Sequence, residues 1–176
     1  AKLEGCVFSG IDGPQLVFVN GHFSNELSIV GELPAGVEVG NIAAAACDPA
    51  PVEDAFGALN AASFTDGALV RVADDVCFET PIRVYFLSTG GDGATANVRN
   101  HITLGANSKA TILESWTGAD AAYFNNTITE LSVGDNAQLE HLKFQDESTS
   151  AFHVAGLHAT MGRDCRVAHH SIALGG

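Results

Sequence analysis

The chain has 176 residues, the size of a single domain, and carries a net charge of −13 from 21 acidic residues against 8 Lys and Arg. This excess of acid argues against nucleic acid and anionic membrane surfaces as partners, because like charges repel. The longest apolar run, from Ile42 to Cys47, is far shorter than the roughly 18 residues that span a bilayer. The four cysteines show no CxxC spacing and we find no secretory leader, so we expect reduced thiols in a cytoplasmic protein.

Residues 1–63 are predicted to form an N-terminal cap that begins with a hairpin. The apolar run Gln15–Val19 leads into Asn20-Gly21 and continues through His22-Phe23. Asn-Gly between two such runs is typical of a type I′ turn, because both residues tolerate positive φ. A second strand-like pattern with a central turn follows over residues 28–39.

Two short helices are predicted in the second half of this cap. Asn41 can cap a first helix that runs through Ala46, and Pro51 suits the first position of a second helix that ends near Ala62. Asp54 would lie near the positive end of the second helix. We expect these helices to close one end of the domain, because an uncovered sheet exposes unpaired strand edges.

A repeated segment organises residues 64–176. Gly105, Gly134 and Gly162 each begin a Gly-x-Asn/Asp turn that an alternating run follows, and they are 134 − 105 = 29 and 162 − 134 = 28 residues apart. Ala73 begins a weaker copy of the same turn. A fixed period of this length is typical of a solenoid.

The content of each repeat predicts a parallel β-helix. Apolar and polar residues alternate after every turn, as strands require, and no amphipathic helix of ordinary length fits between the turns. Successive strands should therefore stack as rungs about 4.8 Å apart. We predict an all-β fold with a core over residues 64–176 and a cap over residues 1–63, joined in one continuous structural domain.

Histidines are concentrated near the end of the chain and suggest a metal site. His141 and His169 share the repeat position of Ile112, so they should stack on neighbouring rungs, and Cys165 is nearby in sequence. Imidazole and thiolate together suit Zn or Fe. The alternative is that the histidines are core or rim residues bonded to the backbone, and that Cys165, aligned with Ala137, is a small buried side chain.

Four glutamates raise a second alternative, a carbohydrate-active enzyme. A pair of carboxylates at a suitable separation is sufficient for glycoside hydrolysis. We expect scattered acids in so acidic a chain to be solvated, and we assign no catalytic residue. The four are Glu114, Glu130, Glu140 and Glu147.

A set of short strings resembles the SufB/SufD family, and its SufD branch more than its SufB branch. The strings are Arg99-Asn100, Glu114, Tyr123 to Glu130, Leu139-Glu140-His141, Gln145 to Ser148, Ala151-Phe152-His153 and, earlier, Leu16 to Gly21 and Ala58 to Gly67. The resemblance implies a right-handed parallel β-helix. It also implies a non-catalytic scaffold in a cytosolic complex with SufB and the ATPase SufC that assembles iron–sulfur clusters.

The resemblance further implies that the chain is a central fragment. Full-length members continue through further rungs and a helical segment, where the cysteines and histidines linked to cluster assembly lie. No resident cofactor is therefore expected here, although iron or a cluster could pass through the full complex. An open last rung near Gly176 could also pair with a second copy and form a homodimer. The rival function is a β-helix polysaccharide lyase or hydrolase.

Overall fold

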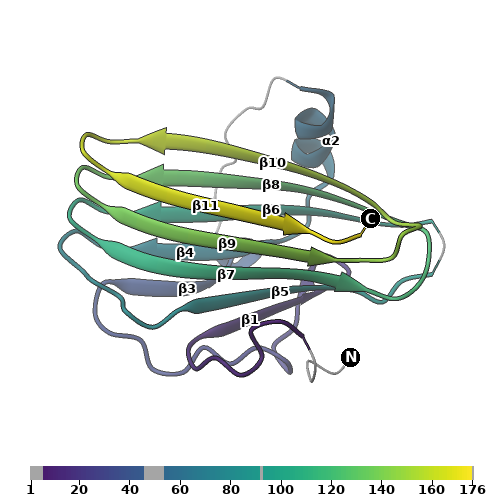
Figure 1. The fold of residues 1–176 in the computed structure, drawn as a ribbon, viewed down its shortest axis with the longest axis horizontal. Helices are drawn as coiled ribbons and strands as arrows, with labels where there is room; N and C mark the ends of the chain where they lie inside the picture. Colours follow the sequence, from purple (N-terminus) through teal and green to yellow (C-terminus); the bar gives the residue numbers. More distant parts are fainter. Residues whose placement is uncertain (1–5, 46–53, 92, 176) are drawn as a thin grey trace.

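The computed structural model describes residues 6–45, 54–91 and 93–175, which form two β-sheets facing each other (Figure 1). The first sheet contains β1 (Gln15–Val19), β2 (His22–Phe23), β5 (Ile82–Ser88), β7 (Lys109–Gly118), β9 (Gln138–Asp146) and β11 (Arg166–Ala173). The second contains β3 (Val37–Asn41), β4 (Ala68–Val72), β6 (Ala94–Leu104), β8 (Tyr123–Val133) and β10 (Phe152–Met161). Their orders are β11-β9-β7-β5-β1-β2 and β10-β8-β6-β4-β3.

From β4 onward the chain alternates between the two sheets, so each pair of strands makes one rung of a parallel β-helix. In Figure 1 the nearer strands run to the right, the farther strands run to the left, and the chain climbs with each turn. This path is right-handed. The described strands complete about four turns, and the predicted fold is confirmed.

The repeated glycines lie in one column. A Cβ built on Gly134 would be 2.8 Å from the carbonyl carbon of Gly105, and one on Gly162 would be 2.8 Å from that of Gly134. The peptide N–H of Gly134 donates to the Leu104 carbonyl of the rung below. Gly105, Gly134 and Gly162 therefore mark a true stacking interval, because only a residue without Cβ permits this approach.

An asparagine ladder runs beside the glycine column. Asp75, Asn107, Asn136 and Asp164 all have positive φ, between 55° and 62°. The Asn107 amide donates to Asp75 Oδ1 at 2.8 Å, and the Asn136 amide donates to Asn107 Oδ1 at 3.2 Å. Asn and Asp tolerate the left-handed region, so these turns reverse the chain and also bind each other.

The hairpin and the strand after it close the first end of the β-helix. Asn20 and Gly21 have φ values of 51° and 81°, as a type I′ turn requires, and confirm the predicted hairpin. β1 pairs in parallel with β5, whereas β3 pairs antiparallel with β4. The strand-like pattern predicted over residues 28–39 forms a strand only from Val37.

The second helix does not close this end as we expected. α1 spans Ile42–Ala45 and α2 spans Ala55–Ser63, with Asp54 as N-cap; the predicted limits Ala46 and Pro51 lie outside the described residues. The buried amide of Asn60 in α2 donates to two carbonyls, those of Val98 in β6 and Asn126 in β8. α2 therefore packs beside the second sheet, where these two hydrogen bonds hold it. The cap boundary at residue 63 stays a prediction.

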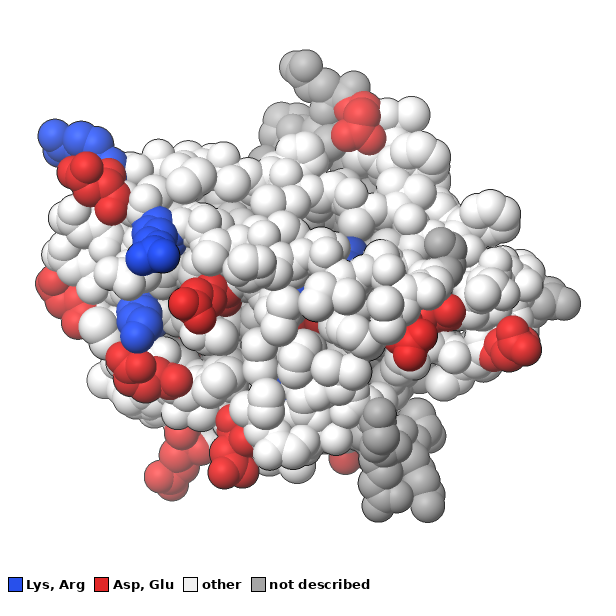
Figure 2. Space-filling view, in the orientation of Figure 1, with Lys and Arg blue, Asp and Glu red and all other residues white. Residues whose placement is uncertain are grey.

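Charged side chains on the surface are mostly acidic. On the face in Figure 2 acidic groups are spread widely, and the basic groups gather toward the turns at the left. Lys109 pairs with Glu79 at 3.2 Å, and Arg163 pairs with Asp135 at 3.6 Å. Among the described residues, none of the helices has the length and apolar character needed to cross a membrane.

Candidate functional site

The interior of the β-helix changes from apolar to polar along the first sheet. One inward column reads Ile82, Ile112, His141 and His169 from rung to rung. The next inward column reads Val84, Glu114, Lys143 and Ser171. The parallel register therefore brings a buried carboxylate, a lysine and two histidines together inside the last two turns.

Glu114 is the centre of this cluster. Its Oε2 accepts a hydrogen bond from His141 Nε2 at 2.8 Å, and its Oε1 accepts one from the Trp116 indole. Burial opposes ionisation of Glu114, but the hydrogen bond and charge of His141, the charge of Lys143 and the Trp116 bond outweigh it and lower the pKa to about 2. Glu114 is thus an ionised carboxylate inside the protein.

The two histidine rings face each other across neighbouring rungs. His141 Nδ1 lies 3.2 Å from His169 Nδ1, and the ring centroids are 4.8 Å apart. His141 is buried, whereas His169 lies at the exposed side of the last described rung. Partial burial, and then the neighbouring His141, lower the pKa of His169, which favours a neutral imidazole near pH 7.

A second chain of polar contacts starts at Lys143. Its Nζ donates to His153 Nε2 at 2.8 Å, and His153 Nδ1 lies 2.7 Å from Glu147 Oε2. Asn125 donates to the other Glu147 oxygen at 2.6 Å. Burial lowers the pKa of Lys143, while Glu114 and Glu147 oppose that change.

A cavity of about 140 Å³ lies between the histidine pair and the second sheet. Its wall includes the Thr127 hydroxyl, which is buried and has no hydrogen-bond partner among the described residues. The lining residues are Glu114, Thr127, Thr129, His141, Lys143, Ala155, Gly156, Leu157, His169 and Ser171. Carboxylate, ammonium, imidazole and hydroxyl groups therefore converge on one small space.

Arg99 and Glu130 form a separate pair on the outer side of the second sheet. Arg99 Nε donates to Glu130 Oε1 at 2.7 Å, and His101 Nε2 lies 3.4 Å from Glu130 Oε2. Arg99 Nη1 also donates to Asn60 in α2. These contacts join the helix to the sheet, and we assign the pair a structural role.

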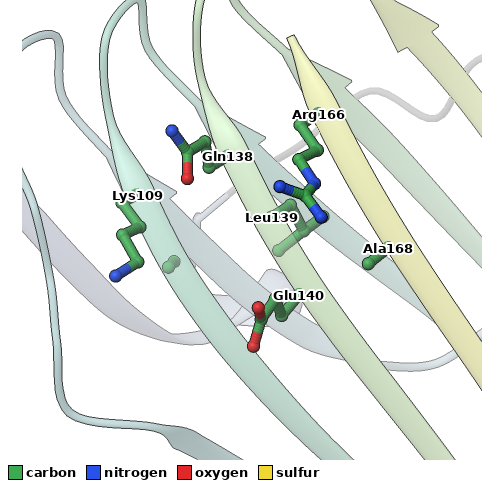
Figure 3. A pocket seen from close by; sticks show the side chains of 7 residues that line it. Lys109, Gln138, Leu139, Glu140, Arg166 and Ala168 are labelled. Carbon is green, nitrogen blue, oxygen red and sulfur yellow. The ribbon is translucent and has the colours of Figure 1, made fainter.

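A smaller hollow of about 80 Å³ lies on the outside of the first sheet (Figure 3). Its polar groups are Lys109, Gln138, Glu140 and Arg166, which come from three neighbouring strands. Glu140 is exposed and agrees with our expectation of a solvated acid. Such a mixed-charge surface is common, and the buried cluster is the stronger candidate.

Comparison of the sequence with known protein families identifies the family to which the chain belongs. The family model described as SUF system FeS cluster assembly, SufBD core domain, matches residues 86–176, just over half of the chain. The chain belongs to the SufBD core family. The resemblance to SufB and SufD is thereby confirmed.

Two relatives support this membership of the SufBD family. An iron–sulfur cluster assembly SufBD family protein from Synechocystis sp. is 28% identical over 186 residues, which cover 92% of this chain and 40% of that protein. The iron–sulfur cluster assembly protein SufD of Escherichia coli is 31% identical over 88 residues, covering 49% of this chain and 21% of that protein. The chain spans less than half the length of either relative.

The strings that resemble the SufB/SufD family converge in space. Glu114, His141, Glu147 and His153 come from four different strings, and all four belong to the contacts described above. Asn125, from a fifth string, bonds Glu147. Five of the eight strings therefore contribute residues to the polar contacts inside the last turns of the β-helix, and the other three lie elsewhere in the fold.

The three residues predicted as metal ligands are only partly brought together. His141 and His169 meet as their repeat position predicts. The Cys165 thiol instead donates to the Gly162 carbonyl at 3.2 Å within the turn. Among the described residues, no group of three or more His, Cys, Asp or Glu side chains is arranged to hold a metal ion. Metal binding by these residues stays a prediction.

Sequence reasoning missed the buried role of the acids. Glu114, Glu130 and Glu147 are 3%, 9% and 6% exposed, so our expectation of solvated glutamates is wrong for these three. Each lies beside a histidine or an arginine inside the protein. The signal for Glu114 was present, because it alternates in phase with Ile112 and Trp116, which face the core.

Proposed function

We propose that this chain is the core of a non-catalytic scaffold component in the cytoplasmic complex of SufB, SufD and the ATPase SufC that assembles iron–sulfur clusters. The observation that carries the proposal is the family match over residues 86–176, which covers the turns that contain the buried cluster. A scaffold role suits a fold that is stiff and continuous, because parallel rungs bond each neighbour along their whole length.

The last described rung supports a role in assembly with other chains. Among the described strands, β10 and β11 each have one neighbour, β8 and β9, so one edge of each has no partner strand there. Exposed apolar side chains lie on or directly beside these strands: Phe152, Leu157, Met161, Ile172 and Leu174. Such an edge can accept a further strand, either from a longer version of this chain or from a second subunit. Pairing of two copies as a homodimer is part of this proposal.

The contacts of the glutamates give no support to the rival carbohydrate-active enzyme. Glu114 and Glu147 lie against histidines, and Glu130 binds Arg99. A general acid or base must reach its substrate, and these carboxylates are occupied by protein partners. We therefore retain the scaffold as the proposed function.

Co-purification tests this proposal directly. The full-length protein that contains this segment should be tagged in its native cells, isolated without oxygen and examined by mass spectrometry. We expect SufB and SufC in near-stoichiometric amounts. Gly134→Val, which forces a Cβ to within 2.8 Å of the backbone below, is a variant that should lose both partners. Recovery of neither protein with the unaltered chain would contradict the proposal.

A further inference from the structure

The two nitrogens of the histidine pair, which share a hydrogen bond, lie at a distance that also suits two ligands on one metal ion. Imidazole nitrogens bind first-row metals at about 2.0–2.1 Å, so two of them on one ion lie roughly 2.8–3.4 Å apart for bond angles from 90° to tetrahedral. The observed separation between His141 Nδ1 and His169 Nδ1 is 3.2 Å. The rungs therefore hold the two nitrogens at a distance that a shared ion requires.

Glu114 fixes which nitrogen of His141 is available. Its carboxylate accepts a hydrogen bond from Nε2, which leaves Nδ1 as the nitrogen that faces His169. A carboxylate bound to the far nitrogen of a histidine is the usual support for a metal ligand, because it orients the ring and increases its basicity. Glu114 is thus a positioning residue.

The cavity beside the pair can supply the remaining ligands. Its volume of about 140 Å³ is sufficient for several water molecules. The Thr127 hydroxyl, buried and without a partner among the described residues, points to a polar occupant. Ser171 adds a second hydroxyl to the wall.

The local charge favours a cation. Glu114 and Glu147 contribute negative charge, and Lys143 is the positive group between them, while His153 links Lys143 to Glu147. The Lys143 ammonium in the wall disfavours a cation by itself, and the carboxylates on either side of it offset its charge. Two carboxylates against one lysine leave the cluster with a net negative balance.

We propose that His141 and His169 bind one divalent first-row transition metal ion through their Nδ1 atoms, with Glu114 orienting His141 and cavity waters or hydroxyls completing the coordination. Only two protein side chains ligate the ion, so the site should exchange metal rather than hold it permanently. His169 lies at the exposed side of the last described rung, which gives the ion a path to the site. The proposal does not depend on the scaffold function.

Titration with Co²⁺ tests this site, because the visible absorption of Co²⁺ changes when imidazole replaces water. The purified, metal-free protein should bind one Co²⁺ per chain, with Zn²⁺ displacing it. We expect His169→Ala to weaken binding by at least about 100-fold and Glu114→Gln by roughly 10- to 100-fold. The matched control is His170→Ala, which removes the exposed neighbouring imidazole on the opposite side of β11 and should leave the affinity unchanged.

Each variant should be checked by circular dichroism and thermal unfolding, so that loss of metal is not confused with loss of fold. His169 is exposed and its replacement should preserve the structure. His169→Gln provides a second test at the same position, since it keeps a polar side chain but lacks the imidazole. Absence of Co²⁺ binding by the unaltered protein, or equal binding by His169→Ala and His170→Ala, would overturn the proposal.

Discussion

The early and late turns of the β-helix share one backbone but fill their interiors differently. Between β5 and β7 the inward columns pair Ile82 with Ile112, and Phe86 stacks on Trp116 with ring centroids 4.0 Å apart. Between β9 and β11 the first of these columns pairs His141 with His169. The hydrogen bonds between rungs are independent of side chains, so the scaffold can exchange an apolar core for a polar one.

This difference separates the interior positions that stabilise the fold from those that serve another role. An apolar interior stabilises by burial, whereas a buried polar group must be bonded to avoid a cost of several kcal/mol. Glu114 satisfies this condition with two donors. Val or Ile fills the equivalent positions one rung earlier. The polar residues with these specific partners are therefore not required for stability, which indicates that they serve another purpose.

Disrupting the glycine column, which both regions share, should have the largest effect on stability. In Gly134→Val the added Cβ would lie 2.7 Å from Ala106 N and 2.8 Å from the Gly105 carbonyl carbon. We expect the free energy of unfolding to fall by more than about 4 kcal/mol in urea titrations, because two backbone rungs must separate. The control Gly40→Val, where a Cβ meets no atom within 4 Å, should cost less than about 1 kcal/mol. Equal midpoints for the two variants would refute the stacking argument.

Replacing a buried polar residue of the late turns by an apolar one should have the next largest effect on stability. His141→Ile removes the partner of a buried carboxylate and should destabilise the protein by about 3–5 kcal/mol. Adding Glu114→Val makes both positions apolar, like the residues directly below them in the stack. Val84 lies below Glu114, and Ile112 lies below His141. The double variant should recover about half of the loss in chemical unfolding. A double variant less stable than His141→Ile would show that the polar interior itself stabilises the fold.

Acid should weaken the polar region through Glu114. Its pKa is about 2 in the folded protein against its usual 4.5, so its contribution is complete above pH 4.5 and is lost as the pH falls toward 2. The loss should reach roughly 3 kcal/mol, measured by urea unfolding at several pH values. Glu114→Gln should flatten this dependence, and Glu140→Gln, an exposed residue, should not. An unchanged slope in Glu114→Gln would contradict the assignment of an ionised Glu114.

Surface charge should matter least in both regions. Lys109 lies 3.2 Å from Glu79, and both side chains are largely exposed. We expect Lys109→Ala to change the free energy of unfolding by less than about 1 kcal/mol, and the change to shrink further in high salt. A larger effect that persists in high salt would contradict this expectation. It would mean that Lys109 stabilises the protein by more than a solvent-screened ion pair can.

The rungs could be predicted from sequence because their register is fixed by a visible period. Once Gly105, Gly134 and Gly162 are aligned, every residue after them has a defined neighbour, and His169 must lie over His141. The type I′ hairpin at Asn20-Gly21 could be predicted for a similar reason, since few residues adopt positive φ at two successive positions.

The burial of the acids and the place of the second helix could not be predicted in the same way. Alternation assigns a residue to a face, but it does not say what covers that face. Glu130 lies on the outer side of its sheet and is nevertheless buried, beside Arg99, which also binds Asn60 of α2. The packing of α2 depends on the carbonyls of two strands that are distant in sequence, for which no local signal exists.

Anomalous diffraction from crystals grown with Co²⁺ tests the central claim of a polar, metal-binding interior most directly. The account predicts one strong peak roughly 2.1 Å from the Nδ1 atoms of both His141 and His169, with Glu114 still bonded to His141 Nε2. A Co²⁺ peak elsewhere on the chain, or two histidine rings that face each other with no metal between them at saturating Co²⁺, would contradict it.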